Sequence, residues 1–149
     1  MWTKYSQRSR ASGFSLLEVL IAVLVLAVGL LGVAALQLNG LKNNQSALQR
    51  SLATALAYSM MDAMRANRAG ALAGNYTMTK TCTPPSGGTL VSNDKRVWIE
   101  TLKANLGDAD TTCGEVSCTG AVCTVTVYWD DSRGSAGDAS QVIQVTSQL

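Results

Sequence analysis

The chain has 149 residues, of which 47% are hydrophobic and 5% aromatic, and it carries a formal net charge of +2 with no histidine. The lack of histidine removes the commonest general base and the commonest metal ligand. From Phe14 onward nine Lys and Arg face ten Asp and Glu, a balance that does not favour a nucleic-acid-binding surface.

A short basic segment precedes a long apolar one at the N-terminus. Residues 1–13 are polar and carry three cations, Lys4, Arg8 and Arg10. From Val19 to Leu36 no side chain is polar, and ~20 mainly apolar residues suffice for a helix to span a bilayer. We therefore predict a leader over 1–13 and a membrane-spanning helix over 14–41, with the basic end on the cytoplasmic side.

Two ordinary explanations compete for this apolar segment: a cleaved secretory signal and an uncleaved signal anchor. Neither accounts for Glu18. A carboxylate inside an apolar helix costs roughly 2.5–3.5 kcal/mol on insertion scales unless it is paired or neutral. If the chain is cut after Gly13, Phe14 gains a free amine one helical turn from Glu18, and that amine can pair with this acid or with a neighbour's.

The sequence GFSLLE at 13–18, followed by the unbroken apolar run, resembles the class III signal of type IV pilins and pseudopilins. The likeness extends over roughly 12–41. It implies that a prepilin peptidase cuts between Gly13 and Phe14 and methylates the new amine of Phe14. It also implies that Glu18 guides docking of the subunit into a growing filament.

The helix is expected to continue beyond the membrane. Between Gly40 and Gly70 there is no proline or glycine, and apolar residues recur at steps of four and seven, as in an amphipathic helix: Leu41, Leu48, Leu52, Leu56, Met60 and Met64. We predict one helix from Phe14 to about Ala66, ~80 Å long at 1.5 Å per residue. Residues 67–75 are expected to form its exit.

Two features bear on the subfamily. Major pilins commonly carry a proline in the first helix, whereas no proline precedes Pro84 here, which favours a minor pilin or a pseudopilin. The segments Arg65-Ala66-Asn67 and Gly74-Asn75-Tyr76 resemble the region after the long helix in PilV-type minor pilins. For Arg65 and Arg68, a solvated helix face is an equally good explanation.

Shorter elements are predicted in the rest of the chain. In order, they are a strand Tyr76–Lys80, a loop Thr83–Asn93, a helix Asp94–Leu106 with Ser92 or Asn93 as its cap and Gly107 as its end, a hairpin of Glu115–Cys118 and Val122–Asp130, a turn Asp131–Ala139 and a strand Gln141–Thr146. This order predicts an α+β fold. The long N-terminal helix would pack on a small C-terminal antiparallel sheet, with a periplasmic body over 42–149, which is also the architecture of pilins.

All four cysteines lie beyond the apolar segment: Cys82, Cys113, Cys118 and Cys123. An even count behind a membrane-targeting segment favours disulfides in an oxidising compartment, here the bacterial periplasm. Cys118 and Cys123 flank the turn of the predicted hairpin, where facing Cα atoms lie at disulfide distance. We expect Cys118–Cys123 and therefore Cys82–Cys113, with Cys113–Cys123 as the main alternative. The remoteness of Cys82 and the compartment argue against a zinc site.

Five acids are predicted to occupy turns, where an Asp side chain bonds nearby backbone amides: Asp108, Asp110, Asp130, Asp131 and Asp138. The chain has no EF-hand calcium loop and no set of acid, base and nucleophile. We therefore expect no metal, no cofactor and no enzymatic activity.

The expected function follows from the resemblance. It implies a minor pilin, processed by prepilin peptidase, that helps to initiate or modify a type IV pilus together with other minor pilins and the major pilin. The chain would sit in the inner membrane with a cytoplasmic N-terminus before it joins the pilus. The alternatives are a type II secretion pseudopilin and a pilus-tip subunit that binds a surface or DNA, although the charge balance speaks against nucleic acid.

Overall fold

The computed structural model describes residues 13–134 and 137–149. The predicted leader therefore lies outside the described residues, except for Gly13. The chain divides into a unit that ends at Leu38 and a second unit, Asn39–Leu149. Each unit is described by itself.

The long helix α1 runs from Leu16 to Ala66. It ends at the predicted residue and starts two residues later than predicted. Ser15 sets the start, because its carbonyl accepts the N–H of Glu18 at 3.0 Å and its hydroxyl accepts the N–H of Leu17 at 3.3 Å. The first turn of a helix leaves such N–H groups without partners, and serine is among the residues that satisfy them best.

The exit from α1 contains a short helix that was not predicted. Helix α2 spans Arg68–Leu72. Asn67 caps it by accepting the N–H of Gly70 at 3.4 Å. The chain then turns at Gly74, whose φ of 78° is in the left-handed region that glycine adopts without steric cost.

Helix α3 spans Leu90–Leu106 and thus starts four residues before the predicted Asp94. The cap is Thr89: its hydroxyl accepts the N–H of Ser92 at 3.2 Å, and its own N–H donates to the Ser92 hydroxyl at 2.8 Å. This reciprocal pair is a capping box, in which the second residue is usually Glu or Gln. Serine in that place concealed the true start, whereas the predicted end at Gly107 is confirmed.

Four antiparallel strands form one sheet in chain order: β1 Met78–Thr81, β2 Cys113–Thr119, β3 Val122–Trp129 and β4 Gln141–Gln148. The central ladder pairs Val116 with Val125 and Val125 with Val145. The strand ends differ from their predicted positions by at most two residues, which is typical of element ends.

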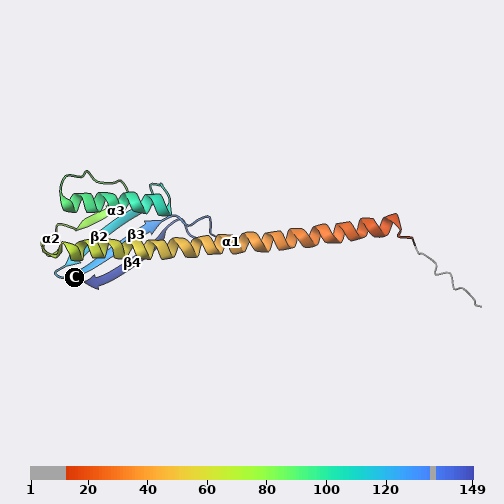
Figure 1. The fold of residues 1–149 in the computed structure, drawn as a ribbon, viewed down its shortest axis with the longest axis horizontal. Coiled ribbons are helices and arrows are strands. Elements are labelled where there is room, and N and C mark those ends of the chain that lie inside the picture. Colours follow the sequence, from red (N-terminus) through yellow and green to blue (C-terminus); the bar gives the residue numbers. More distant parts are fainter. Residues whose placement is uncertain (1–12, 135–136) are drawn as a thin grey trace, which may run out of the picture. The chain divides into compact units, whose positions relative to one another are not determined.

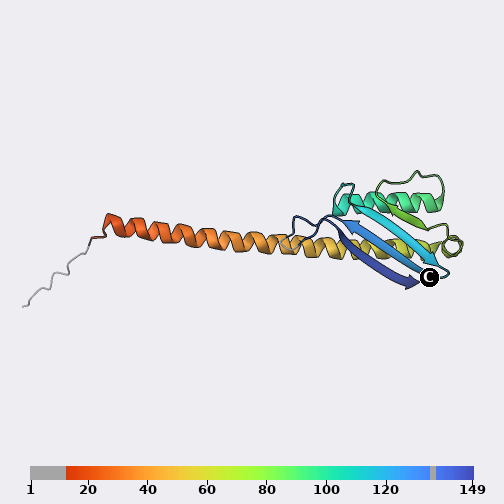
Figure 2. The same cartoon turned by 180° about the vertical axis from the view of Figure 1, so that it is seen from behind.

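Helices α1 and α3 cover one face of this sheet (Figure 1). Figure 2, seen from behind, shows the strands in front of the two helices. The buried core joins all three parts: Ala53, Ala57, Met60, Met61 and Met64 of α1, Trp98, Ile99, Leu102 and Leu106 of α3, and Val116, Val125, Val127 and Trp129 of the strands. The indole N–H of Trp98 also donates to the carbonyl of Leu56 at 2.9 Å. The predicted α+β fold, a long helix packed on a small antiparallel sheet, is thus confirmed.

Candidate functional site

Phe14 and Glu18 lie together where α1 begins. Glu18 is in the first turn of α1, where the unpaired N–H groups of a helix favour a negative charge. Both side chains line one shallow depression, together with Val19, Ala22, Val23 and Leu26. In the uncut chain the Phe14 nitrogen is an uncharged amide. Cleavage after Gly13 would turn it into an ammonium close to the Glu18 carboxylate.

The described residues give no steric reason for a glycine at position 13, because a Cβ added there would meet none of their atoms within 4 Å. An enzyme that closes around the bond between Gly13 and Phe14 would give such a reason.

The apolar half of α1 is not covered by any other part of the chain that the structure describes. Its large hydrophobic side chains are 49–91% exposed between Phe14 and Leu41, and its best 18-residue window has a mean hydropathy of 3.0 with 0% of the window buried. Contact of such a surface with water is unfavourable by roughly 25 cal/mol per Å². The length and composition suit a membrane span, and the surface needs lipid or other protein chains around it.

Two residues of the PilV-like segments, Asn67 and Tyr76, form a hydrogen-bond network with Asp94 of α3. The Asn67 side-chain amide donates to the Tyr76 hydroxyl at 3.4 Å, and the Tyr76 hydroxyl donates to Asp94 Oδ2 at 2.5 Å. Tyr76 is fully buried. Burial raises the pKa of Tyr76, and its hydrogen bond to Asp94 raises that pKa further. The network fixes the bend after α1 against α3.

Arginines of α1 and α2 contact β4 and the residue after it. Arg65 pairs with Asp62 at 2.8 Å and donates to the Ser147 hydroxyl at 2.8 Å. Arg68 donates to the carbonyl of Leu149 at 3.3 Å. The alternative of a purely solvated arginine face therefore describes only part of their environment.

The structure contains the disulfides Cys82–Cys113 and Cys118–Cys123, with Cα–Cα distances of 4.0 and 4.1 Å. Cys118 and Cys123 face each other across the β2–β3 ladder. These are the two pairs expected from the sequence, and the alternative Cys113–Cys123 does not form. Among residues 13–134 and 137–149 there is no free cysteine and no cluster of three or more His, Cys, Asp or Glu that could hold a metal.

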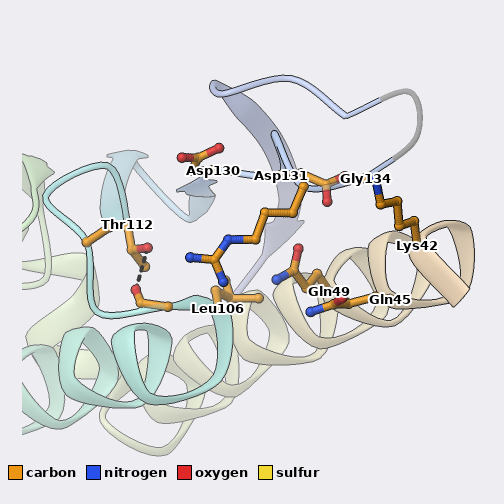
Figure 3. Close-up of a pocket in the computed structure, with 11 residues that line it drawn as sticks. Lys42, Gln45, Gln49, Leu106, Thr112, Asp130, Asp131 and Gly134 are labelled. Carbon is orange, nitrogen blue, oxygen red and sulfur yellow. Dashed lines mark hydrogen bonds between the residues drawn. The ribbon is translucent and has the colours of Figure 1, made fainter. Parts of the chain in front are cut away.

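A pocket of about 110 Å³ lies where α1, the end of α3 and the segment after β3 meet (Figure 3). Asp131 forms part of its wall and is only 3% exposed. The sequence predicts that Asp131 lies in a turn, and its carbonyl does accept the N–H of Gly134 at 2.9 Å. In addition, the hydroxyl of Ser46 on α1 donates to the Asp131 carboxylate. Sequence reasoning missed this contact because 85 residues separate the two side chains and neither lies in a recognisable motif.

The neighbouring acids behave as the turn prediction expects. Asp130 accepts the N–H of Ser132 at 2.8 Å, and Asp138 accepts the N–H of Ser140 at 3.1 Å. The hydrogen bonds from Ser132, with a smaller contribution from the charge of Arg133, lower the pKa of Asp130.

Residues 8–34 match the family model described as the prokaryotic N-terminal methylation motif. No curated protein and no solved structure matches the chain. The methylation motif, the exposed apolar part of α1 and the small α+β body together fit the architecture of type IV pilin-like proteins. The motif supports a type IV pilin-like or pseudopilin chain that prepilin peptidase processes and that takes part in pilus assembly.

Proposed function

We propose that this chain is a PilV-type minor pilin, cut between Gly13 and Phe14, that helps to initiate or modify a type IV pilus. The observation that carries the proposal is the position of Glu18. It is the acid in the first turn of an otherwise apolar segment, beside the residue that becomes the new N-terminus.

Pairing between an acid and an amine drives assembly in this proposal. An unpaired carboxylate within lipid costs roughly 2.5–3.5 kcal/mol. The methylated ammonium of Phe14 relieves that cost in the membrane. In the filament a neighbour's ammonium can serve Glu18 equally well, so the pairing guides docking. Lipid covers the apolar helix before assembly, and the helices of neighbouring subunits cover it afterwards.

We place the N-terminus in the cytoplasm and the body in the periplasm of a bacterial inner membrane, before transfer to the pilus. The cations of the leader, Lys4, Arg8 and Arg10, favour this orientation. The two disulfides suit an oxidising compartment. The partners are prepilin peptidase, other minor pilins, the major pilin and the assembly machinery. The role is structural rather than enzymatic.

The PilV-type assignment draws support from the network of Asn67, Tyr76 and Asp94. Asn67 and Tyr76 both belong to the PilV-like segments. In this network they act together to fix the path of the chain after the long helix. A type II secretion pseudopilin is the second candidate, since it uses the same N-terminal signal. Adjacent genes for minor pilins or for a secretion system distinguish the two.

Substitution of Glu18 tests the proposal. In Glu18→Ala, membrane insertion is retained, while incorporation into pili falls roughly tenfold or more, because the partner ammonium is left buried and unpaired. Glu100→Ala is the matched control: it removes a carboxylate whose exposed ion pair with Arg96 contributes little. Immunoblots of sheared pili and of membranes measure both quantities. Normal incorporation of Glu18→Ala would refute the proposed role of Glu18.

A further inference from the structure

The pocket near the start of the second unit combines side chains of opposite charge in one partly open space. Three polar residues of α1 line one side: Lys42, Gln45 and Gln49. Asp130 and Asp131 line the opposite side (Figure 3), and Arg133 also contributes to the lining. The pocket therefore offers ammonium, guanidinium and amide donors together with carboxylate acceptors.

The two cations can hold a phosphate group. The ion pairs found among residues 13–134 and 137–149 do not include Lys42 or Arg133. Charged N–H donors form short, strong hydrogen bonds to phosphate, and a guanidinium can do so through two parallel N–H groups.

The two aspartates of the pocket differ in their roles. Asp131 is buried and hydrogen-bonded to Ser46, so it holds the segment after β3 against α1. The hydrogen bonds from Ser132 lower the pKa of Asp130 and so favour its ionised form. A carboxylate has about four acceptor sites, and the backbone and side chain of Ser132 occupy two of those of Asp130. Asp130 can therefore accept a hydrogen bond from a primary ammonium.

The size of the pocket limits what can enter. Its volume of about 110 Å³ is well below the ~300–1,000 Å³ typical of sites for drug-sized ligands. A small polar group fits in this volume, whereas an acyl chain would remain outside.

The position along α1 indicates where the ligand comes from. Lys42 directly follows Leu41, the end of the apolar segment, and Gln49 is only ~10 Å further along a helix that rises 1.5 Å per residue. The headgroup layer of a bilayer is roughly 5–8 Å deep on each side of the hydrocarbon. If 14–41 spans a membrane, Lys42 is the first residue beyond the hydrocarbon and is within reach of the lipid headgroups.

We propose that this pocket binds the headgroup of phosphatidylethanolamine while the chain is anchored in the membrane. Lys42 and Arg133 hold the phosphate, and Asp130 accepts an N–H from the primary ammonium. The inference rests on the membrane anchoring in the proposed function. Phosphatidylglycerol has no ammonium for Asp130, and the quaternary ammonium of phosphatidylcholine has no N–H to donate. Transfer into the filament would release the bound lipid.

Native mass spectrometry of the full chain, ejected from nanodiscs with equal amounts of phosphatidylethanolamine and phosphatidylglycerol, tests the inference. We expect phosphatidylethanolamine to be retained preferentially. The double variant Lys42→Gln, Arg133→Gln should retain about tenfold less, as expected when charged hydrogen bonds are lost. Arg50→Gln is the matched control, because Arg50 follows Gln49 on α1 but contacts Gln141 and does not line the pocket.

Three outcomes would overturn the inference: equal retention of both lipids, unchanged retention by the double variant, or an adduct of a divalent cation in place of the lipid. Soluble phosphoethanolamine should displace the lipid. If soluble phosphoethanolamine does not displace the lipid, the headgroup assignment is also overturned, because the lipid would then be bound through its acyl chains.

A second measurement on chains from the native host separates the inference from the proposed function. Cleavage after Gly13 in the double variant, with lipid retention lost, supports the inference and leaves the proposed function intact. If the wild-type chain retains phosphatidylethanolamine preferentially but is never cut, the lipid-binding inference is supported. Only the proposed function is then overturned.

Discussion

The hydroxyl of Tyr76 donates a hydrogen bond to Asp94 Oδ2 at 2.5 Å and so ties the segment that follows the long helix to α3. Tyr76 is fully buried, and its hydroxyl also accepts from the Asn67 side chain. These hydrogen bonds join two connecting segments, after α1 and before β1, to helix α3, so their strength bears on the stability of the whole body.

Removal of the Tyr76 hydroxyl should destabilise the body. We expect Tyr76→Phe to lower the free energy of unfolding by about 1–3 kcal/mol, the range for a hydrogen bond to a charged group whose loss leaves its partner unsatisfied. Tyr58→Phe is the control: Tyr58 is 49% exposed, and the change should stay within about 0.5 kcal/mol. Urea unfolding followed by tryptophan fluorescence measures both, and equal effects would contradict the account.

The same tyrosine should make stability depend on alkaline pH. The fold raises the pKa of Tyr76 above 10.0, first by burial and then through Asp94, so the fold favours the protonated form. The stabilisation is complete below pH 10 and is lost as the pH rises through the folded value. The pKa of Tyr128, raised first by its hydrogen bond to Glu115, acts in the same direction.

Comparison with Tyr76→Phe isolates the Tyr76 effect. Burial lowers the pKa of Lys95, so its titration acts in the opposite direction and is common to both proteins. The difference in unfolding free energy between wild type and Tyr76→Phe should shrink above about pH 10. A difference that stays constant from pH 8 to pH 12 would show that the raised pKa of Tyr76 does not contribute to stability.

Gly114 on β2 should not tolerate a side chain. A Cβ there would lie 2.3 Å from Trp98 Cζ3 and 2.8 Å from Ile99 Cδ1, and both side chains are buried in the core. Overpacking of this kind typically costs about 1–3 kcal/mol, so Gly114→Ala should unfold at lower urea. Ser117→Ala, at an exposed position of the same strand, is the control. Equal midpoints for the two variants would rule out a close approach of α3 to β2.

The two disulfides should contribute unequally. Cys82–Cys113 spans 31 residues and Cys118–Cys123 only 5. In the chain-entropy model the longer loop stabilises more, here by about 1.5 kcal/mol. We expect the pair Cys82→Ala, Cys113→Ala to lose more stability than the pair Cys118→Ala, Cys123→Ala in the same urea assay. The reverse order would contradict this entropic explanation.

Local patterns in the sequence were sufficient to predict much of the fold. The apolar run and the alternation along 122–129 predict α1 and β3 because each depends on residues close together in the chain. The exact helix starts depend on side-chain hydrogen bonds, as at Ser15 and Thr89. Such bonds can be formed by several neighbouring residues, so composition alone does not select among them.

Contacts between segments that are distant in the chain could not be predicted from the sequence. Ser46 and Asp131 are ordinary polar residues in isolation, and only the fold brings them together at the pocket. The place of Gly114 beneath Trp98 is another case, because a glycine in a strand has several possible explanations. The assembly signal was readable because Gly13, Phe14 and Glu18 are close in sequence as well as in space.

The most direct test is the mass of the N-terminal peptide of the protein isolated from its native host. The account predicts that this peptide begins at Phe14 and carries one additional methyl group on its amine. A chain that retains Met1 would contradict the account, because Glu18 would then have no new ammonium beside it. A chain trimmed beyond Leu36 would contradict it as well, because Glu18 and the apolar helix would both have been removed.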